Sequence, residues 1–387
     1  MDPDAADKLE SSENERLPPA PHGSSSQRGR HWLGQLPVDS WAWYLWPMTS
    51  LGLSTLLHAQ EAIHDFPGLY ALGVLVYMVG VIEYFLTIIL KTNKALLNRR
   101  TLIKSISKPS EAMFFATFWI STFGLITAGI QYSDPAPGGN LATTFFAIFW
   151  IWIIFALCAS VGMFIMLAHI NALESKDMTP AWLLPLFPLI LTGVMTGSLA
   201  ECLGEAQAFP VLITGLIYSG VGFLLSLPVD GIYLWRLYCA GLPGPDKRPA
   251  MMLAVGPPSY APLAFLKMAA VVPTHYAVFA EIPIAGVVCQ VMALVFGVAI
   301  VGMALFLFLM AFFCILRRAN QMSFHLTWYG FIFPNVGLVS LVGVLGAEIP
   351  SDGVQWVVSV FTALIVGAWL FVFGMHMRAL VMKKDAF

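Results

Sequence analysis

One basic side chain, Lys267, stands inside a long apolar segment of this sequence, between Phe265 and Met268. A lysine at the centre of a membrane-spanning helix costs roughly 2.5–3.5 kcal/mol to insert, so such a residue is by default a candidate functional site. An ammonium group that faces a wet path can attract an anion, and we therefore predict that Lys267 contacts an anionic substrate. The alternative is a lysine whose head group reaches an interface or pairs with a carboxylate.

Hydroxyl groups also occur inside apolar segments, at Thr49 and Ser50 and again at Thr192 and Thr196. We predict that these segments line an interior path and that the substrate sits near the midplane of a membrane. There it would be held by Thr192, Thr196 and Lys267, with Thr49 and Ser50 on the same path. The alternative is that small residues at these places merely permit close packing of helices.

One carboxyl group, Glu83, likewise falls within an apolar segment. We interpret it either as a hydrogen-bonded or protonated carboxyl between helices or as a proton-linked site. The sequence contains no GxxxxGK[ST], HExxH or CxxC motif and no histidine cluster with ligand spacing. We therefore expect no cofactor, no metal site and no enzyme activity. An integral-membrane enzyme or scaffold is the alternative of another class, and it would need a buried cluster of Glu or His.

The composition indicates which elements must position these groups. Hydrophobic residues make up 58% of the 387 residues and charged residues only 11%, whereas soluble domains carry about 25% charged residues. Apolar runs long enough to span a bilayer recur along the chain. We predict an all-α integral membrane protein with ten transmembrane helices, at 39–58, 68–90, 111–131, 141–169, 181–200, 208–228, 257–273, 283–316, 324–346 and 354–377. The run 283–316 is treated as one long helix because no proline or polar turn divides it.

Positive charges alternate between the segments that join these spans. Of the 20 basic residues, all except Lys267 fall in the two tails or in loops that follow even-numbered spans, whereas loops after odd-numbered spans carry only acidic charges. The positive-inside rule then places both termini in the cytosol. We predict a disordered cytoplasmic tail over 1–37, a ten-helix domain over 38–380 and a short cytoplasmic tail over 381–387. The net charge of −2 argues against a nucleic-acid partner.

Prolines divide the spans into two classes. Pro47, Pro185, Pro262 and Pro334 interrupt odd-numbered spans, whereas the even-numbered spans are longer and largely free of interior proline. Proline leaves a backbone carbonyl without its helical partner, and in a bilayer such a group persists only where protein or water satisfies it. We therefore predict five helical hairpins around a central pore, in which odd spans line the interior and even spans face lipid.

Three segments resemble parts of a known family. They are Trp328-Tyr329-Gly330-Phe331-Ile332-Phe333-Pro334-Asn335, the run 248–259 with its RPxMM and GPPS elements, and the run 111–119. Together they resemble the tellurite-resistance/dicarboxylate transporter family of the voltage-dependent anion channel superfamily, and the run 248–259 is similar to its fungal malic acid branch. The resemblance covers about residues 38–380. It implies ten helices in five hairpins around one pore, closed by a phenylalanine of the ninth helix. Phe333 matches this residue best, with Phe331 as the alternative.

The resemblance also implies a function. We expect transport of small organic anions across the plasma membrane, with malate and other C4-dicarboxylates as substrates. A sulfite efflux pump or an anion channel of the same family is the alternative, and the choice between a channel and a proton-coupled carrier stays open. The expected partners are the lipid bilayer and the anionic substrate. Some relatives form trimers, so a homotrimer is expected by analogy.

Overall fold

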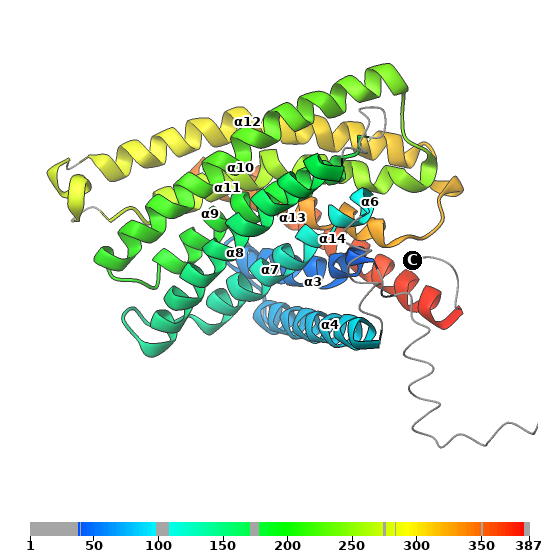
Figure 1. The fold of residues 1–387 in the computed structure, drawn as a ribbon. Coiled ribbons are helices and arrows are strands. Elements are labelled where there is room, and N and C mark those ends of the chain that lie inside the picture. The colour runs from blue at the N-terminus through cyan, green and yellow to red at the C-terminus, as the bar shows by residue number, and fades with distance from the viewer. Residues whose placement is uncertain are drawn as a thin grey trace, which may run out of the picture. The chain divides into compact units, whose positions relative to one another are not determined.

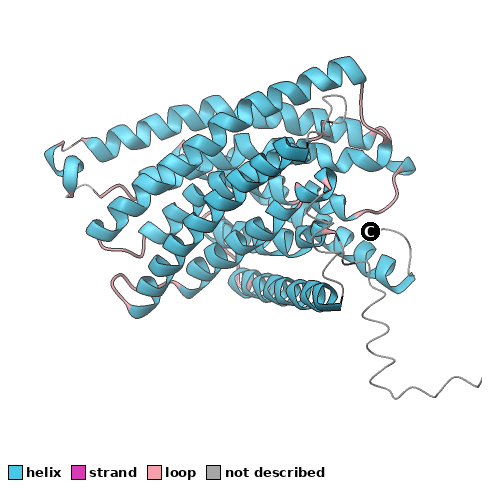
Figure 2. Ribbon diagram, viewed as in Figure 1, coloured by secondary structure: helices cyan, strands magenta, loops and turns pink. Residues whose placement is uncertain are grey.

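The computed structural model describes residue 38 and residues 40–97, 108–170, 178–273, 276–282, 284–349 and 351–382. All regular elements within these ranges are helices, as Figures 1 and 2 show. The predicted tail over 1–37 lies outside the described residues, as does most of the predicted tail over 381–387. The basic residues within 98–107 and 171–177 also lie outside them.

The helices follow one another in a regular order, in which η denotes a 3₁₀ helix. They are η2 (Trp41–Tyr44), α3 (Leu45–Glu61), α4 (Leu69–Leu97), α6 (Pro109–Ala112), α7 (Phe115–Ser133), α8 (Asn140–Ile170), η4 (Pro180–Leu186), α9 (Phe187–Ala200), α10 (Glu205–Ala240), η5 (Pro245–Val255), α11 (Gly256–Ala270), η6 (Ala277–Glu281), α12 (Ala285–Leu316), η7 (Ala319–Gln321), η8 (Leu326–Phe331), α13 (Phe333–Glu348) and α14 (Asp352–Met382). Each predicted span overlaps one long α-helix, and the run 283–316 is the single helix α12.

Seven helical stretches of the described chain are long and apolar enough to cross a membrane. They are α4, α8, η4 with α9, α10, α12, η8 with α13, and α14. The other three predicted spans form α3, α7 and α11, which have 17, 19 and 15 residues and are not among the seven. Helices α3 and α11 fall short of the about 20 apolar residues with which a helix crosses the hydrocarbon core by itself.

Five α-helices form a closed inner ring. In it α3 packs on α7, α7 on α9, α9 on α11, α11 on α13, and α13 on α3 again. The most apolar stretch within Pro180–Ala200 is 100% buried, whereas the corresponding stretch of α12 is only 17% buried. The odd-numbered spans are therefore the inner helices, as the prolines and small residues predict.

The five remaining long helices each lie across a joint of this ring. Helix α4 packs on α3 and α7, α8 on α7 and α9, α10 on α9 and α11, α12 on α11 and α13, and α14 on α13 and α3. Their outward faces expose large apolar side chains such as Ile82, Ile154, Leu224 and Phe306. Water-soluble proteins rarely expose apolar surface of this extent, so these faces contact lipid.

Four inner helices share the same kind of beginning. A 3₁₀ segment leads into each, and a proline lies in its first turn: Pro47, Pro188, Pro257 and Pro334. Proline suits this position because its N–H is not needed there and its φ angle is already helical. These prolines define where the α-helices start. Phe187 and Phe333 directly precede Pro188 and Pro334, so the prolines also fix where along the helix axes these two side chains enter the ring.

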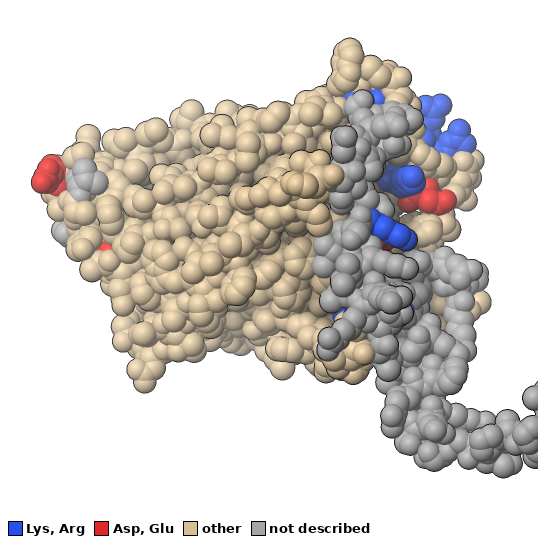
Figure 3. All heavy atoms as spheres, viewed as in Figure 1, with Lys and Arg blue, Asp and Glu red and all other residues tan. Residues whose placement is uncertain are grey.

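Charged side chains gather at the two ends of the helices. In Figure 3, Lys and Arg lie at one end, Asp and Glu lie at both ends, and the band between the ends is nearly free of charge. Lys91 and Arg317 mark the basic end, near the last residues of α4 and α12, whereas Glu61 and Glu205 mark the acidic end. An uncharged band of this kind is where the hydrocarbon of a bilayer lies.

Candidate functional site

Three aromatic rings from different inner helices meet inside the ring. Phe333 of α13 is 1% exposed. Its ring stacks on that of Tyr260 of α11, with centroids 5.0 Å apart, and lies 6.3 Å from that of Phe187 of α9. Tyr260 and Phe187 are also neighbours, at 6.4 Å. We call these three side chains the aromatic plug.

Glycines on the inner helices make room for the plug. A Cβ atom on Gly52 of α3 would lie 2.8 Å from the ring of Phe333. A Cβ atom on Gly256 of α11 would overlap the ring of Phe187. The plug therefore touches α3, α9, α11 and α13, four of the five inner helices.

The structure separates the two phenylalanines that were candidates for closing a pore. Phe331 is half-buried at the end of η8, whereas Phe333 is the first residue of α13 and belongs to the plug. The hydroxyl group of Tyr260 donates a hydrogen bond of 2.8 Å to the backbone carbonyl oxygen of Phe333. Of the two, only Phe333 thus contacts the other rings of the aromatic plug.

Lys267 lies seven residues beyond Tyr260 on α11, which is about 10 Å along an α-helix. Its Nζ atom donates to the hydroxyl oxygen of Ser198 of α9 at 3.5 Å. Its Cβ atom lies directly over Gly197 of the same helix. The side chain therefore sits at the contact between two inner helices, on the acidic side of the plug.

The imidazole of His58 on α3 is a second ionisable group near Lys267. It was not among the site residues predicted from the sequence. His58 interacts electrostatically with Lys267, Glu61 and Glu201. A histidine near the end of an apolar span carries no signal of its own, because such residues are common at membrane interfaces. Lys267, Ser198 and His58 come from three inner helices, and we call them the polar cluster.

Two of the predicted substrate hydroxyls, Thr49 and Ser50, lie on α3 and are fully buried. Thr49 donates to the carbonyl oxygen of Trp46, one turn earlier, at 2.8 Å. Ser50 accepts a hydrogen bond of 3.0 Å from the indole of Trp369 on the outer helix α14. Ser50 is therefore turned toward an outer helix in this arrangement.

The other two predicted hydroxyls, Thr192 and Thr196, lie on α9 and are also turned outward. Thr192 donates to the carbonyl oxygen of Pro188 at 2.7 Å and accepts from the indole of Trp152 on α8 at 3.1 Å. Thr196 packs against Gly215 of α10. The structure thus places the four hydroxyl residues on inner helices without bringing them together with Lys267.

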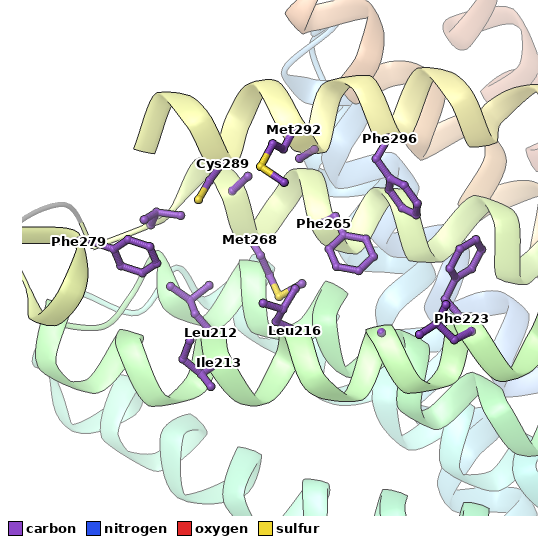
Figure 4. A pocket seen from close by; sticks show the side chains of 15 residues that line it. Leu212, Ile213, Leu216, Phe223, Phe265, Met268, Phe279, Cys289, Met292 and Phe296 are labelled. Atoms are coloured by element: carbon purple, nitrogen blue, oxygen red, sulfur yellow. The ribbon is translucent and has the colours of Figure 1, made fainter. Parts of the chain in front are cut away.

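A separate groove of about 510 Å³ opens between α10, α11 and α12. Figure 4 shows Phe265 and Met268 of α11 at its floor, between side chains of α10 and α12. Every residue that lines it is apolar: Leu212, Ile213, Leu216, Gly220, Phe223, Leu224, Phe265, Met268, Ala269, Val272, Phe279, Cys289, Met292, Ala293 and Phe296. The groove offers no polar group to an anion, and it is distinct from the plug and the polar cluster.

An enzyme or metal site would need a cluster of titratable side chains. Within the described part of the chain, no group of three or more His, Cys, Asp or Glu side chains could hold a metal ion. Several ionisable side chains of the outer helices, among them Glu83, Asp230 and His376, are nevertheless almost fully buried.

Comparison with known proteins accords with this architecture. Two proteins of Schizosaccharomyces pombe named for malic acid transport are each 26% identical to this chain, over 89% and 94% of its length and 80% and 82% of theirs. A sulfite efflux pump of Arthroderma otae is 22% identical over 85% of the chain and 88% of the pump. The sequence profile described as voltage-dependent anion channel matches residues 40–377, which include all ten long helices apart from the last turns of α14. This chain belongs to the voltage-dependent anion channel family.

Proposed function

We propose that this protein transports small organic anions, malate and other C4-dicarboxylates among them, through the centre of the inner ring. The observation that carries the proposal is the placement of Lys267 about 10 Å along α11 from Tyr260, whose ring stacks on that of Phe333. A positive group beside an apolar constriction draws anions to the point where passage is controlled. The relatives named for malic acid transport support malate as the substrate.

The proposal includes a transmembrane arrangement. All ten long helices would cross the bilayer as five hairpins around the path, within a transport domain of residues 38–380. Helices α3, α7 and α11 can do so despite their length and polarity because the outer helices shield them from lipid. The basic end would face the cytosol, so that the tails 1–37 and 381–387 are both cytoplasmic, in the plasma membrane.

Within this path the aromatic plug is the gate. The ring of Phe333 rests against Gly52 and closes the interior, so transport requires it to move. Thr49, Ser50, Thr192 and Thr196 remain predicted substrate contacts. Their side chains are turned to the backbone or to outer helices in this closed arrangement, and they would reach the substrate only after the inner helices rotate.

Uptake into liposomes tests the proposal. The purified protein is reconstituted, and entry of labelled malate and labelled sulfite is measured side by side, with protein-free liposomes as the control. We expect saturable malate uptake that unlabelled C4-dicarboxylates inhibit. If neither anion enters and no anion current appears, the proposed function is wrong.

Sulfite export is the second candidate, because sulfite efflux pumps are also relatives, at 22% identity. Sulfite flux without malate flux in the same experiment would favour it. By analogy with the family we also propose a homotrimer, in which parts of the apolar outer faces pack against each other instead of lipid. Native mass spectrometry of the detergent-solubilised protein tests this, and a single-chain mass would reject the trimer.

A further inference from the structure

Glu83 is a carboxyl group buried on an outer helix without a counter-charge. It lies on α4, it is 2% exposed, and neither of its oxygen atoms has a hydrogen-bond partner among the described residues. An ionised carboxylate in such surroundings has lost its water without receiving a cation in return, and the polar groups nearest to it are the neutral side chains of Ser50 and Trp46, so the ionised form is unfavourable. The surroundings therefore favour the neutral acid, which carries a proton.

The groups that face this carboxyl are uncharged. They are the hydroxyl of Ser50 and the indole of Trp46, both on α3. The ionisable side chains on the helices packed around this region are Tyr44 on η2, His58 and Glu61 on α3, Tyr70, Tyr77, Tyr84, Lys91 and Lys94 on α4, Tyr132 on α7, Tyr329 on η8, and Asp352, His376 and Arg378 on α14.

Lys91 does not neutralise Glu83, although both lie on α4. Lys91 follows Glu83 by eight positions, which corresponds to about 12 Å along the helix. The Nζ atom of Lys91 instead donates to the carbonyl oxygens of Val38 and Ser40, at 3.3 and 3.0 Å.

A short stretch of α3 connects Glu83 to the aromatic plug. Ser50 faces the carboxyl of Glu83, and Gly52, two residues later, receives the ring of Phe333. A movement of this stretch that frees Phe333 also changes what surrounds the buried carboxyl.

The residue between them, Leu51, ties this stretch to two further helices. A Cβ atom on Gly80 of α4 would lie 2.8 Å from the side chain of Leu51, and one on Gly124 of α7 would lie 2.9 Å from it. The stretch 50–52 is thus closely packed against the part of α4 that carries Glu83.

A second connection reaches the plug through η8. Tyr329 is fully buried four residues before Phe333, and its hydroxyl lies 3.0 Å from Nδ1 of His376 on α14. The ring of His376 lies 4.9 Å from that of Trp46, which faces Glu83. Tyr329 also interacts electrostatically with Glu83. The carboxyl is thus linked to η8, the segment that precedes Phe333, as well as to α3.

We propose that Glu83 is a reversible proton-binding site whose occupancy is coupled to the aromatic plug. The carboxyl holds its proton while the plug is closed and releases it to water when the stretch 50–52 and Phe333 move apart. By reciprocity, proton binding favours the closed arrangement, so a lower pH opposes opening. The coupling rests on the proposed function, because it takes the plug as the gate. The proton site itself does not depend on the proposed function.

Infrared spectroscopy of the full-length protein in liposomes tests the proton site without any transport. We expect a carbonyl band of a protonated carboxylic acid in the wild type near neutral pH that is absent in Glu83→Gln and shifted in Glu83→Asp. The matched control is Asp230→Asn on α10, since Asp230 is 1% exposed and its oxygens also lack partners. That variant must keep the Glu83 band. If Glu83→Gln loses no band, the proposal is overturned.

Anion flux tests the coupling. Malate uptake is compared between about pH 6.5 and about pH 8, where both malate carboxylates are ionised. We expect wild-type flux to fall as pH falls, by at most about tenfold per pH unit for one proton. Glu83→Gln should stay at the low-pH level throughout, and Asp230→Asn should respond like the wild type. A normal pH response in Glu83→Gln overturns the coupling. If the wild type carries no anion, the proposed function fails while the infrared band still decides the proton site.

Discussion

Tyr260 holds Phe333 in two ways at once. Its hydroxyl donates to the backbone carbonyl oxygen of Phe333 at 2.8 Å, and its ring stacks on the phenyl ring at 5.0 Å with an interplanar angle of 28°. Because α13 begins at Phe333, one tyrosine of α11 stabilises both the start of a neighbouring helix and the side chain that we propose as the gate. Substitutions at or next to Tyr260 and Phe333 should therefore change how firmly the proposed gate is closed, without removing any charged side chain from the proposed path.

The variant Tyr260→Phe removes the hydrogen bond and keeps the ring. The lost bond is worth about 0.5–1.5 kcal/mol, and we expect basal anion conductance to rise by roughly two- to tenfold if it stabilises the closed plug. Single-channel or liposome currents measure this. Tyr218→Phe is the matched control, since Tyr218 makes a similar bond to the carbonyl oxygen of Ile153 at 3.1 Å, far from the plug. Equal currents in both variants would contradict the prediction.

The variant Phe333→Ala removes the obstructing side chain itself. Truncating a buried phenylalanine costs about 3–5 kcal/mol of stability, so thermal unfolding is measured alongside function. We expect a folded but less stable protein whose basal anion conductance exceeds that of the wild type by at least about tenfold, which is the factor that about 1.4 kcal/mol represents. Phe331→Ala is the control and should leak little. A folded Phe333→Ala protein with wild-type leak would show that Phe333 is only a packing residue.

The variant Gly52→Ala adds a methyl group where the ring of Phe333 rests. The new Cβ atom would lie 2.8 Å from that ring, so the ring must shift, and overpacking of this kind costs about 1–3 kcal/mol. We expect a lower melting temperature and a higher basal conductance. Gly162→Ala on α8 is the control, because no atom lies within 4 Å of its added Cβ. The prediction fails if Gly52→Ala matches the wild type in both measurements.

The positions of the long helices could be predicted from the sequence because a bilayer demands apolar length and the charges mark its two sides. Helix ends were harder. The sixth span was predicted to end at 228, whereas α10 continues to Ala240 through Pro228. Prolines are tolerated inside membrane helices because neighbouring groups satisfy the freed carbonyl.

The orientation of each helix about its own axis could not be read from residue types. Thr192 and Thr196 suggested a polar lining, but they face Trp152 and Gly215 of outer helices. Small and hydroxyl residues serve close helix packing as well as a wet interior, so only the packing distinguishes the two. Phe333 could be singled out from the sequence because it lies in an aromatic segment that contains a proline. The contact of Gly52 with its ring could be recognised only in the structure.

The contact of Asp246 with Ser323 should depend on pH. The carboxylate accepts hydrogen bonds from the backbone N–H and the hydroxyl of Ser323, at 2.7 and 2.8 Å, and these bonds lower the pKa of Asp246 from its usual 3.8. A carboxyl with a lowered pKa stabilises the folded state at higher pH and loses this contribution as the pH falls through the folded-state pKa. The contact should therefore persist at neutral pH and weaken below the usual pKa.

Hydrogen exchange of the Ser323 amide measures this contact. At neutral pH we expect slower exchange in the wild type than in Asp246→Asn, and the difference should vanish once Asp246 is protonated. Asp352→Asn, at the first residue of α14, is the control and should leave this amide unchanged. Identical exchange in the wild type and Asp246→Asn at neutral pH would refute the prediction.

The variant Lys267→Met tests whether the ammonium group attracts the substrate. Methionine preserves the length and the apolar stem, and replacing a buried charge by an apolar group of similar size is often neutral for stability. A charge-assisted hydrogen bond is worth about 1.5–3 kcal/mol, so we expect the KM for malate uptake to rise by about tenfold to a hundredfold with little change in melting temperature. Lys267→Arg should retain part of the affinity, and Lys247→Met, at an exposed position of η5, should retain all of it. An unchanged KM in a folded Lys267→Met protein would mean that Lys267 serves the contact between α9 and α11 rather than the anion.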